Sequence, residues 1–136
     1  MTRRYFTVEG VNALLPRLMR AAVAVREGAA QLASIAGQRY QSTPPACDTH
    51  VPPAYLQGLQ ALSSGLDTIR ELGGEMKDVD TGLVDFPARR NGADVYLCWR
   101  LGEDAVGWWH DLKGGFSGRS PIAPDDVWDE GDAPTH

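Results

Sequence analysis

The sequence lacks the residues and motifs on which several common enzyme classes depend. It has two cysteines, Cys47 and Cys98, and three histidines, and none of them form a zinc-finger spacing. No Gly-x-Ser-x-Gly elbow, Walker loop or Rossmann glycine set occurs, which excludes the enzyme classes built on those motifs. We expect both cysteines to be free thiols in a reducing compartment.

Long apolar runs and a surplus of basic residues are also missing. No stretch approaches the roughly 18 apolar residues of a membrane span, and no apolar signal core follows the first residues. The sequence therefore predicts a cytoplasmic protein without a membrane partner. The net charge of -5 comes from residues 123–136, which contain no Lys or Arg but carry Asp125, Asp126, Asp129, Glu130 and Asp132. The remaining body is formally neutral, which argues against a nucleic-acid partner.

The length and composition indicate one globular domain. Hydrophobic residues make up 43% and charged residues 23% of the 136 positions, which is ordinary for such a domain. We predict a single α+β domain over residues 1–122, with a helical hairpin at 7–74 and a β-rich part at 75–122. Residues 123–136 form an acidic C-terminal tail, which we expect to be loosely held, with Trp128 as its one anchor.

Helical periodicity dominates the first half. Apolar residues recur every seven positions at Val11, Leu18, Val25 and Leu32, which predicts a helix from Val8 to about residue 39. Thr7 is a suitable N-cap for this helix, and Pro16 predicts a kink or break within it.

A second helix is predicted after the proline-rich loop that contains Cys47 and His50. It begins at Pro53 and ends at Gly73-Gly74. Two such helices pack as an antiparallel hairpin that leaves apolar surface over, which either the back half or a second copy of the chain must cover. We predict a homodimer formed through the hairpin.

The second half follows a strand period. Asn91-Gly92 is a strong hairpin-turn signal, and residues 94–101 form the clearest strand. Residues 83–86 alternate, but Pro87 favours an edge position or a strand end there. Residues 106–112 can return as a third strand. The predicted fold class is α+β: a long antiparallel two-helix hairpin followed by a small antiparallel β-meander.

Three carboxylates in the stretch Lys77–Pro87 are candidate ligands: Asp78, Asp80 and Asp85. Asp80-Thr81-Gly82 matches the aspartic-protease triplet. Those enzymes need two such carboxylates that share one proton, and their folds are nearly all β, whereas half of this chain is predicted to be helical. A calcium loop starting at Asp78 fails, because its sixth and twelfth positions are Leu83 and Arg89. A magnesium or manganese site remains open, as does the simpler interpretation that these acids cap turns and pair with neighbouring basic residues.

His110 and Arg119 are the candidate partners of these carboxylates. His110, the one histidine inside the predicted sheet, is a candidate general base or a structural histidine. Gly114–Arg119 combines glycines with a guanidinium, which suits a small anionic ligand.

Several motifs together resemble a known family. They are Tyr5–Glu9, Asn12–Pro16, Lys77–Pro87, Tyr96–Glu103, Trp109-His110 and Gly115-Phe116-x-Gly118-Arg119-x-Pro121. The chain resembles, from Tyr5 to Pro121, a small bacterial family named domain of unknown function 2203. The resemblance implies a bacterial, intracellular protein and implies no activity. The family usually has an acid in place of Gly10 and an Asp near Lys113, which weakens any metal or acid role for the loop before Phe116.

We therefore predict a non-enzymatic ligand-binding or protein-interaction module. Its polar pocket lies where the sheet meets the helix ends, and its lining consists of Asp78, Asp80, Asp85, His110 and Arg119. The alternative is a divalent-metal-dependent hydrolase that uses the same carboxylates with His110 as base. A purely structural oligomer is third. No cofactor is predicted for the leading function. The hydrolase alternative would require a divalent metal ion.

Overall fold

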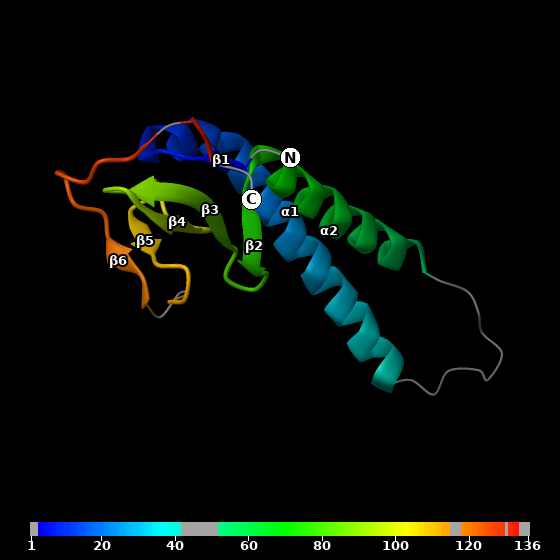
Figure 1. The fold of residues 1–136 in the computed structure, drawn as a ribbon. Helices are drawn as coiled ribbons and strands as arrows, with labels where there is room; N and C mark the ends of the chain where they lie inside the picture. Colours follow the sequence, from blue (N-terminus) through cyan, green and yellow to red (C-terminus); the bar gives the residue numbers. More distant parts are fainter. Residues whose placement is uncertain (1–2, 42–51, 115–117, 130, 134–136) are drawn as a thin grey trace.

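Two long helices, a five-stranded antiparallel sheet and a small antiparallel pair of strands form the protein (Figure 1). The computed structural model describes residues 3–41, 52–114, 118–129 and 131–133. Helix α1 spans Val8–Gln41 and α2 spans Pro53–Leu72. The strands are β1 (Arg3–Tyr5), β2 (Glu75–Asp78), β3 (Leu83–Arg90), β4 (Ala93–Arg100), β5 (Trp108–His110), β6 (Ser120–Pro121) and β7 (Gly131–Ala133). The α+β prediction of a helical hairpin followed by a meander is confirmed.

The helix ends follow the predicted capping chemistry. The Thr7 hydroxyl accepts a hydrogen bond from Gly10 N at 3.0 Å, so Thr7 caps α1. Gly73 ends α2 at φ 101, and its N–H donates to the Arg70 carbonyl. The predicted break of the helix at Pro16 is wrong, because α1 continues through this residue. Pro16 lies on the exposed side of α1, where water can solvate the carbonyl group that the proline leaves unbonded.

Small residues let the two helices approach backbone to backbone. A Cβ atom added to Gly28 would lie 2.6 Å from the Gly58 carbonyl oxygen. One added to Gly65 would lie 2.8 Å from the Ala21 carbonyl oxygen. Gly28 follows Ala21 by one heptad, as Gly65 follows Gly58, so both contacts fall on one stripe of each helix. This contact requires glycine at both heights of the hairpin.

The main sheet has the order β2-β3-β4-β5-β6, with every neighbouring pair antiparallel. At the β3–β4 turn, Asn91 and Gly92 have φ values of 51° and 84°, the signs that a two-residue hairpin turn needs. The turn pairs residues at equal distance on either side, so Val84 lies opposite Trp99 and Asp85 opposite Cys98.

This register separates the two faces of the sheet. Successive side chains of a strand point to opposite faces. The face toward the helices is apolar and packs with Phe6 and the hairpin; its buried residues are Val84, Phe86, Ala88, Val95, Leu97 and Trp99. The opposite face carries Asp85 and Cys98, so the polar residues lie on the side of the sheet away from α1 and α2.

Two details of the strands differ from prediction. β3 is an inner strand, not an edge, but its pairing with β2 stops at Asp85, opposite Glu75. Pro87 lies beyond that point, where its carbonyl accepts a hydrogen bond from Phe6 N at 2.8 Å, so its missing N–H costs no ladder bond. β5 is shorter than predicted, and Leu112 beyond it is largely exposed.

The acidic tail is held at two places: β7 pairs antiparallel with β1, and the residues before it contact the β3–β4 turn. Arg90 and Asp126 are 2.7 Å apart, and this hydrogen bond with Arg90 lowers the pKa of Asp126. Asn91 exchanges two hydrogen bonds with Val127, and Trp128 bridges to Arg90. The tail is thus held more firmly than predicted. In addition to the anchor at Trp128, charged and backbone groups of the turn bind it.

Replacing Gly65 by alanine tests the close helix contact. Because the new methyl group would meet the Ala21 carbonyl and Val25, we expect unfolding free energy to fall by about 1–3 kcal/mol in chemical denaturation. Ser63→Ala, on the exposed side of the same helix, should change stability by less than about 0.5 kcal/mol. Equal effects of the two substitutions would contradict the contact.

Candidate functional site

Three buried side chains converge on the face of the sheet away from the helices. Asp85, Cys98 and His110 come from β3, β4 and β5 and are 2%, 0% and 4% exposed. One carboxylate oxygen, the thiol sulfur and one ring nitrogen all lie within 4.8 Å of one another. Strand pairing produces this grouping. Cys98 lies opposite Asp85, and Tyr96, two residues before Cys98 on the same face of β4, lies opposite His110.

The hydrogen bonds of His110 constrain its protonation. Nδ1 lies 2.7 Å from the Asp111 carbonyl oxygen, which can only accept, so Nδ1 carries a proton. Nε2 lies 2.9 Å from Asp85 Oδ2. A neutral imidazole with its proton on Nδ1 would point a lone pair at a carboxylate. The Nε2–Oδ2 contact therefore requires a proton on one of the two atoms or a cation bound to both.

Cys98 is a protonated thiol in the absence of a metal. Burial, and next the charge of Asp85, raise the pKa of Cys98 to about 12. A hydrogen bond between the thiol and Asp85 also contributes to the raised pKa of Cys98. Asp85 Oδ1 is buried and accepts no hydrogen bond from any residue that the structure describes.

Arg119 borders the cluster but is already committed to other groups. Its Nη2 lies 3.0 and 3.1 Å from the two carboxylate oxygens of Glu103. Its guanidinium stacks over Trp108 at 4.7 Å and reaches the Cys98 carbonyl at 3.4 Å. Through its hydrogen bond to the Cys98 carbonyl, Arg119 supports the strand that carries Cys98. Because Glu103 neutralises its guanidinium, Arg119 is a weak site for an anion.

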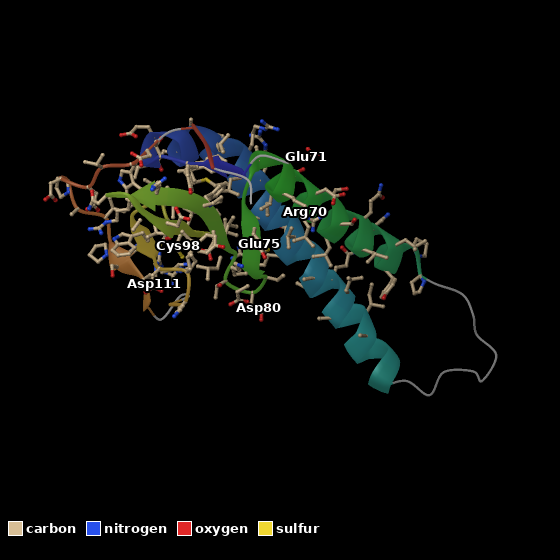
Figure 2. The ribbon with its side chains drawn as sticks, in the orientation of Figure 1. Arg70, Glu71, Glu75, Asp80, Cys98 and Asp111 are labelled. Atoms are coloured by element: carbon tan, nitrogen blue, oxygen red, sulfur yellow. The ribbon has the colours of Figure 1, made fainter. Side chains whose placement is uncertain are left out.

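Asp78, the last residue of β2, and Asp80, in the β2–β3 turn, do not join the cluster. Asp78 accepts hydrogen bonds from Asp80 N at 3.2 Å and from the Thr81 hydroxyl at 3.0 Å. Both acids are exposed, and Figure 2 shows Asp80 at the turn, apart from Cys98 in the sheet. Of the five residues predicted from sequence, the structure brings Asp85 and His110 together, places Arg119 beside them, and leaves these two apart. Of the predicted Gly-rich loop, residues 115–117 lie outside the described part, as do Cys47, His50 and His136.

Cys98 was not among the site residues predicted from the sequence, although a signal for it exists. Asp85 precedes Asn91 by as many residues as Cys98 follows Gly92, and a two-residue turn pairs such positions. The pairing of His110 depends on the irregular segment between β4 and β5, which no turn motif specifies.

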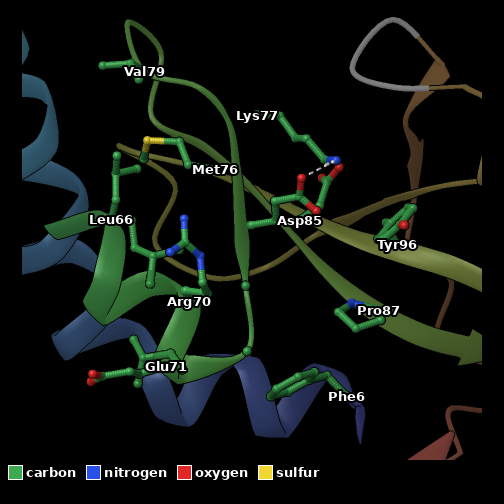
Figure 3. A pocket seen from close by; sticks show the side chains of 15 residues that line it. Phe6, Leu66, Arg70, Glu71, Met76, Lys77, Val79, Asp85, Pro87 and Tyr96 are labelled. Atoms are coloured by element: carbon green, nitrogen blue, oxygen red, sulfur yellow. Dashed lines mark ion pairs between the residues drawn. The ribbon is translucent and has the colours of Figure 1, made fainter. Parts of the chain in front are cut away.

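A second feature adjoins the cluster. A pocket of about 860 Å³ lies where the end of α2 meets β2 and β3, and Asp85 lines it (Figure 3). Of the five residues predicted to line a pocket, Asp85 alone lines this one.

These features define a class: an α+β protein with a helical hairpin on one face of an antiparallel sheet and a buried Asp–Cys–His cluster on the other. The family model described as "Uncharacterized conserved protein (DUF2203)" matches residues 4–122. The chain belongs to this family, as its motifs indicated. No curated protein and no solved structure matches the chain.

The burial of Cys98 predicts an unreactive thiol in metal-free protein. At pH 8, a pKa of about 12 leaves about one thiolate in ten thousand, whereas the ordinary thiol pKa of 9.0 leaves about one in ten. In a Cys47→Ser background, alkylation of the native chain should therefore be at least about 100-fold slower than in denaturant. Similar rates in both conditions would show that Cys98 is accessible.

Proposed function

We propose that the protein is a metal-binding module, without catalytic activity, whose ion is held by Asp85, Cys98 and His110. The observation that carries the proposal is the contact of His110 Nε2 with Asp85 Oδ2, on an imidazole whose other nitrogen is bonded to a carbonyl. A divalent cation resolves that contact, and the Cys98 sulfur lies within reach of the same point.

The donor set favours zinc among divalent ions. A thiolate, an imidazole and a carboxylate are each common zinc ligands, whereas magnesium and calcium take oxygen ligands. Charge also balances: a dication offsets one thiolate and one carboxylate while His110 stays neutral. A neutral assembly is the form of such a site that is least costly to bury.

The groups around the three side chains support the same chemistry. Metal-binding histidines usually donate their second ring N–H to a carbonyl or carboxylate, and His110 does so to the Asp111 carbonyl. Binding would displace the proton of Cys98, since a coordinated thiol is deprotonated. Metal affinity should therefore rise with pH.

Burial favours binding over hydrolysis. A hydrolytic metal centre keeps a position open to water and substrate. The three side chains here are at most 4% exposed, and Asp78 and Asp80, which were to enlarge the site in the hydrolase alternative, lie in an exposed turn. The divalent-metal-dependent hydrolase therefore remains the second candidate, favoured only by the fact that three protein ligands leave a fourth position for water.

Other properties remain predictions. A homodimer through the hairpin is supported by Leu56 and Leu59, which are 55% and 45% exposed on α2. A small anionic ligand at Arg119 would have to compete with Glu103. The described residues contain no helix that could cross a membrane. A bacterial, cytoplasmic origin rests on the family resemblance and the composition.

Calorimetric titration with zinc tests the metal site. We expect one zinc ion per chain, and an affinity at least about 100-fold weaker in Asp85→Asn, Cys98→Ser or His110→Ala, because each removes a ligand. Asp80→Asn is the matched control, since it removes an exposed carboxylate outside the cluster and should leave the affinity unchanged.

The opposite pattern would refute the proposal. Zinc binding that survives the loss of Cys98 but fails in Asp80→Asn would place the ion at the β2–β3 turn. The absence of binding by the correctly folded wild-type chain at any pH from 6 to 9 would remove the metal site altogether.

Light scattering tests the homodimer. The wild-type chain should have twice the mass of one chain, and a Leu56→Glu/Leu59→Glu variant should have the mass of one, because two buried carboxylates would oppose association. Circular dichroism should show unchanged helix content in the variant. A wild-type mass of a single chain at micromolar concentration would contradict the dimer.

A further inference from the structure

An open groove runs between α1 and α2, which lie side by side (Figure 1). Ala21 and Ala24 of α1 and Gly65 of α2 line it, and none of them carries more than a methyl group. The volume of the groove is about 280 Å³, which lies just below the range of sites for drug-sized ligands. No residue in its lining belongs to the metal cluster on the sheet.

Two arginines on the α1 side of this groove carry positive charge that no acid offsets. Arg17 and Arg20 are exposed and form no ion pair within the residues that the structure describes. No acidic residue lies three or four positions from either of them along the helix. Like charges one turn apart on a helix repel each other, so an anion bound between these two arginines would relieve an unfavourable contact.

The α2 side of the groove adds a hydroxyl donor and no competing negative charge. Ser64 and Thr68 line this side. The Thr68 hydroxyl donates to the Ser64 carbonyl at 3.0 Å, which leaves the Ser64 hydroxyl as the donor for a ligand. The one acid between them in sequence, Asp67, lies 3.7 Å from Arg70 and is not in the lining of the groove.

This set of donors matches an anion with two charges. A guanidinium presents a planar fork of N–H groups that fits phosphate, and two guanidiniums offset two negative charges. A phosphate ester carries close to two charges at neutral pH and three strong acceptor oxygens. A carboxylate carries one charge and two oxygens, so it would leave one of the two arginines uncompensated.

We infer that this groove binds the phosphate group of a small phosphate ester between Arg17 and Arg20 of α1 and Ser64 of α2. The small residues of the groove let the phosphate lie between the helices, and the volume limits the rest of the ester to a few carbon atoms. The inference goes beyond the metal site and does not require it.

A set of three anions tests the inference on the full chain. The probes are glycerol 3-phosphate, inorganic phosphate and acetate, each titrated with a chelator present and at constant ionic strength, while the backbone amides are followed by NMR. Glycerol 3-phosphate should shift the amide of Gly65 and bind at least about tenfold more tightly than acetate, because it carries a second charge. Inorganic phosphate should bind more weakly than the ester, because it makes no contact through a carbon body.

Two results of this titration would overturn the inference. Acetate binding as tight as that of glycerol 3-phosphate, or an amide of Gly65 that does not move, would show that the groove is no phosphate site. Inorganic phosphate that binds as tightly as the ester would overturn the assignment of an ester.

Charge-matched variants assign the binding to this groove. Arg17→Gln and Arg20→Gln should each weaken binding of glycerol 3-phosphate at least about fivefold, and Arg20→Lys should also weaken it, because lysine keeps the charge but lacks the planar fork. Arg26→Gln removes the same charge from an exposed position of α1 outside the groove and should have no effect.

Equal effects of the three glutamine variants would show a general attraction of anions and overturn the site. Circular dichroism should show unchanged helix content in each variant, since all three positions are exposed. Because the groove and the metal cluster share no residue, failure of zinc binding leaves this result unaffected, and the reverse also holds.

Discussion

The register of the β3–β4 hairpin is the constraint on which the rest of the structure depends. Asn91 and Gly92 have the positive φ angles of a two-residue turn, and this turn fixes every pair along the two strands. A shift by one residue would exchange the two faces of the sheet. It would turn Val84 and Phe86 away from the helices and bring Asp85 into the core. The same turn therefore forms the core and places Asp85 opposite Cys98.

The helical hairpin supplies the surface on which this sheet packs. Glycines at Gly28, Gly58 and Gly65 bring the helix backbones into contact, so one narrow pair of helices can present a continuous apolar face. Only one face of the sheet is covered in this way. The opposite face is free to hold polar side chains, and burial there comes from neighbouring strands and their loops, not from the helices.

Much of this architecture can be predicted from the sequence because its signals are local. The heptad series from Val11, the cap residues Thr7 and Gly73, and the turn Asn91-Gly92 each specify structure within a few positions. The continuity of α1 through Pro16 depends on solvation, and the tolerance of Pro87 within β3 depends on Phe6, which lies far away in sequence. Local signals do not contain that information.

The candidate site was predictable in part for the same reason. Asp85 and His110 were predicted from their residue types. Asp78 and Asp80 were predicted with them, because proximity in sequence does not reveal which acids are buried. Cys98 follows from the turn register once Asp85 is chosen. The contact of His110 with Asp85 depends on the irregular segment before β5, and only a structure places it.

The central claim is that Asp85, Cys98 and His110 bind one metal ion together, and X-ray absorption at the zinc edge tests it most directly. The zinc-loaded protein should show one sulfur ligand at about 2.3 Å and nitrogen or oxygen ligands at about 2.0–2.1 Å. The sulfur contribution should disappear in Cys98→Ser. A coordination shell of nitrogen and oxygen alone in the wild-type protein would contradict the account.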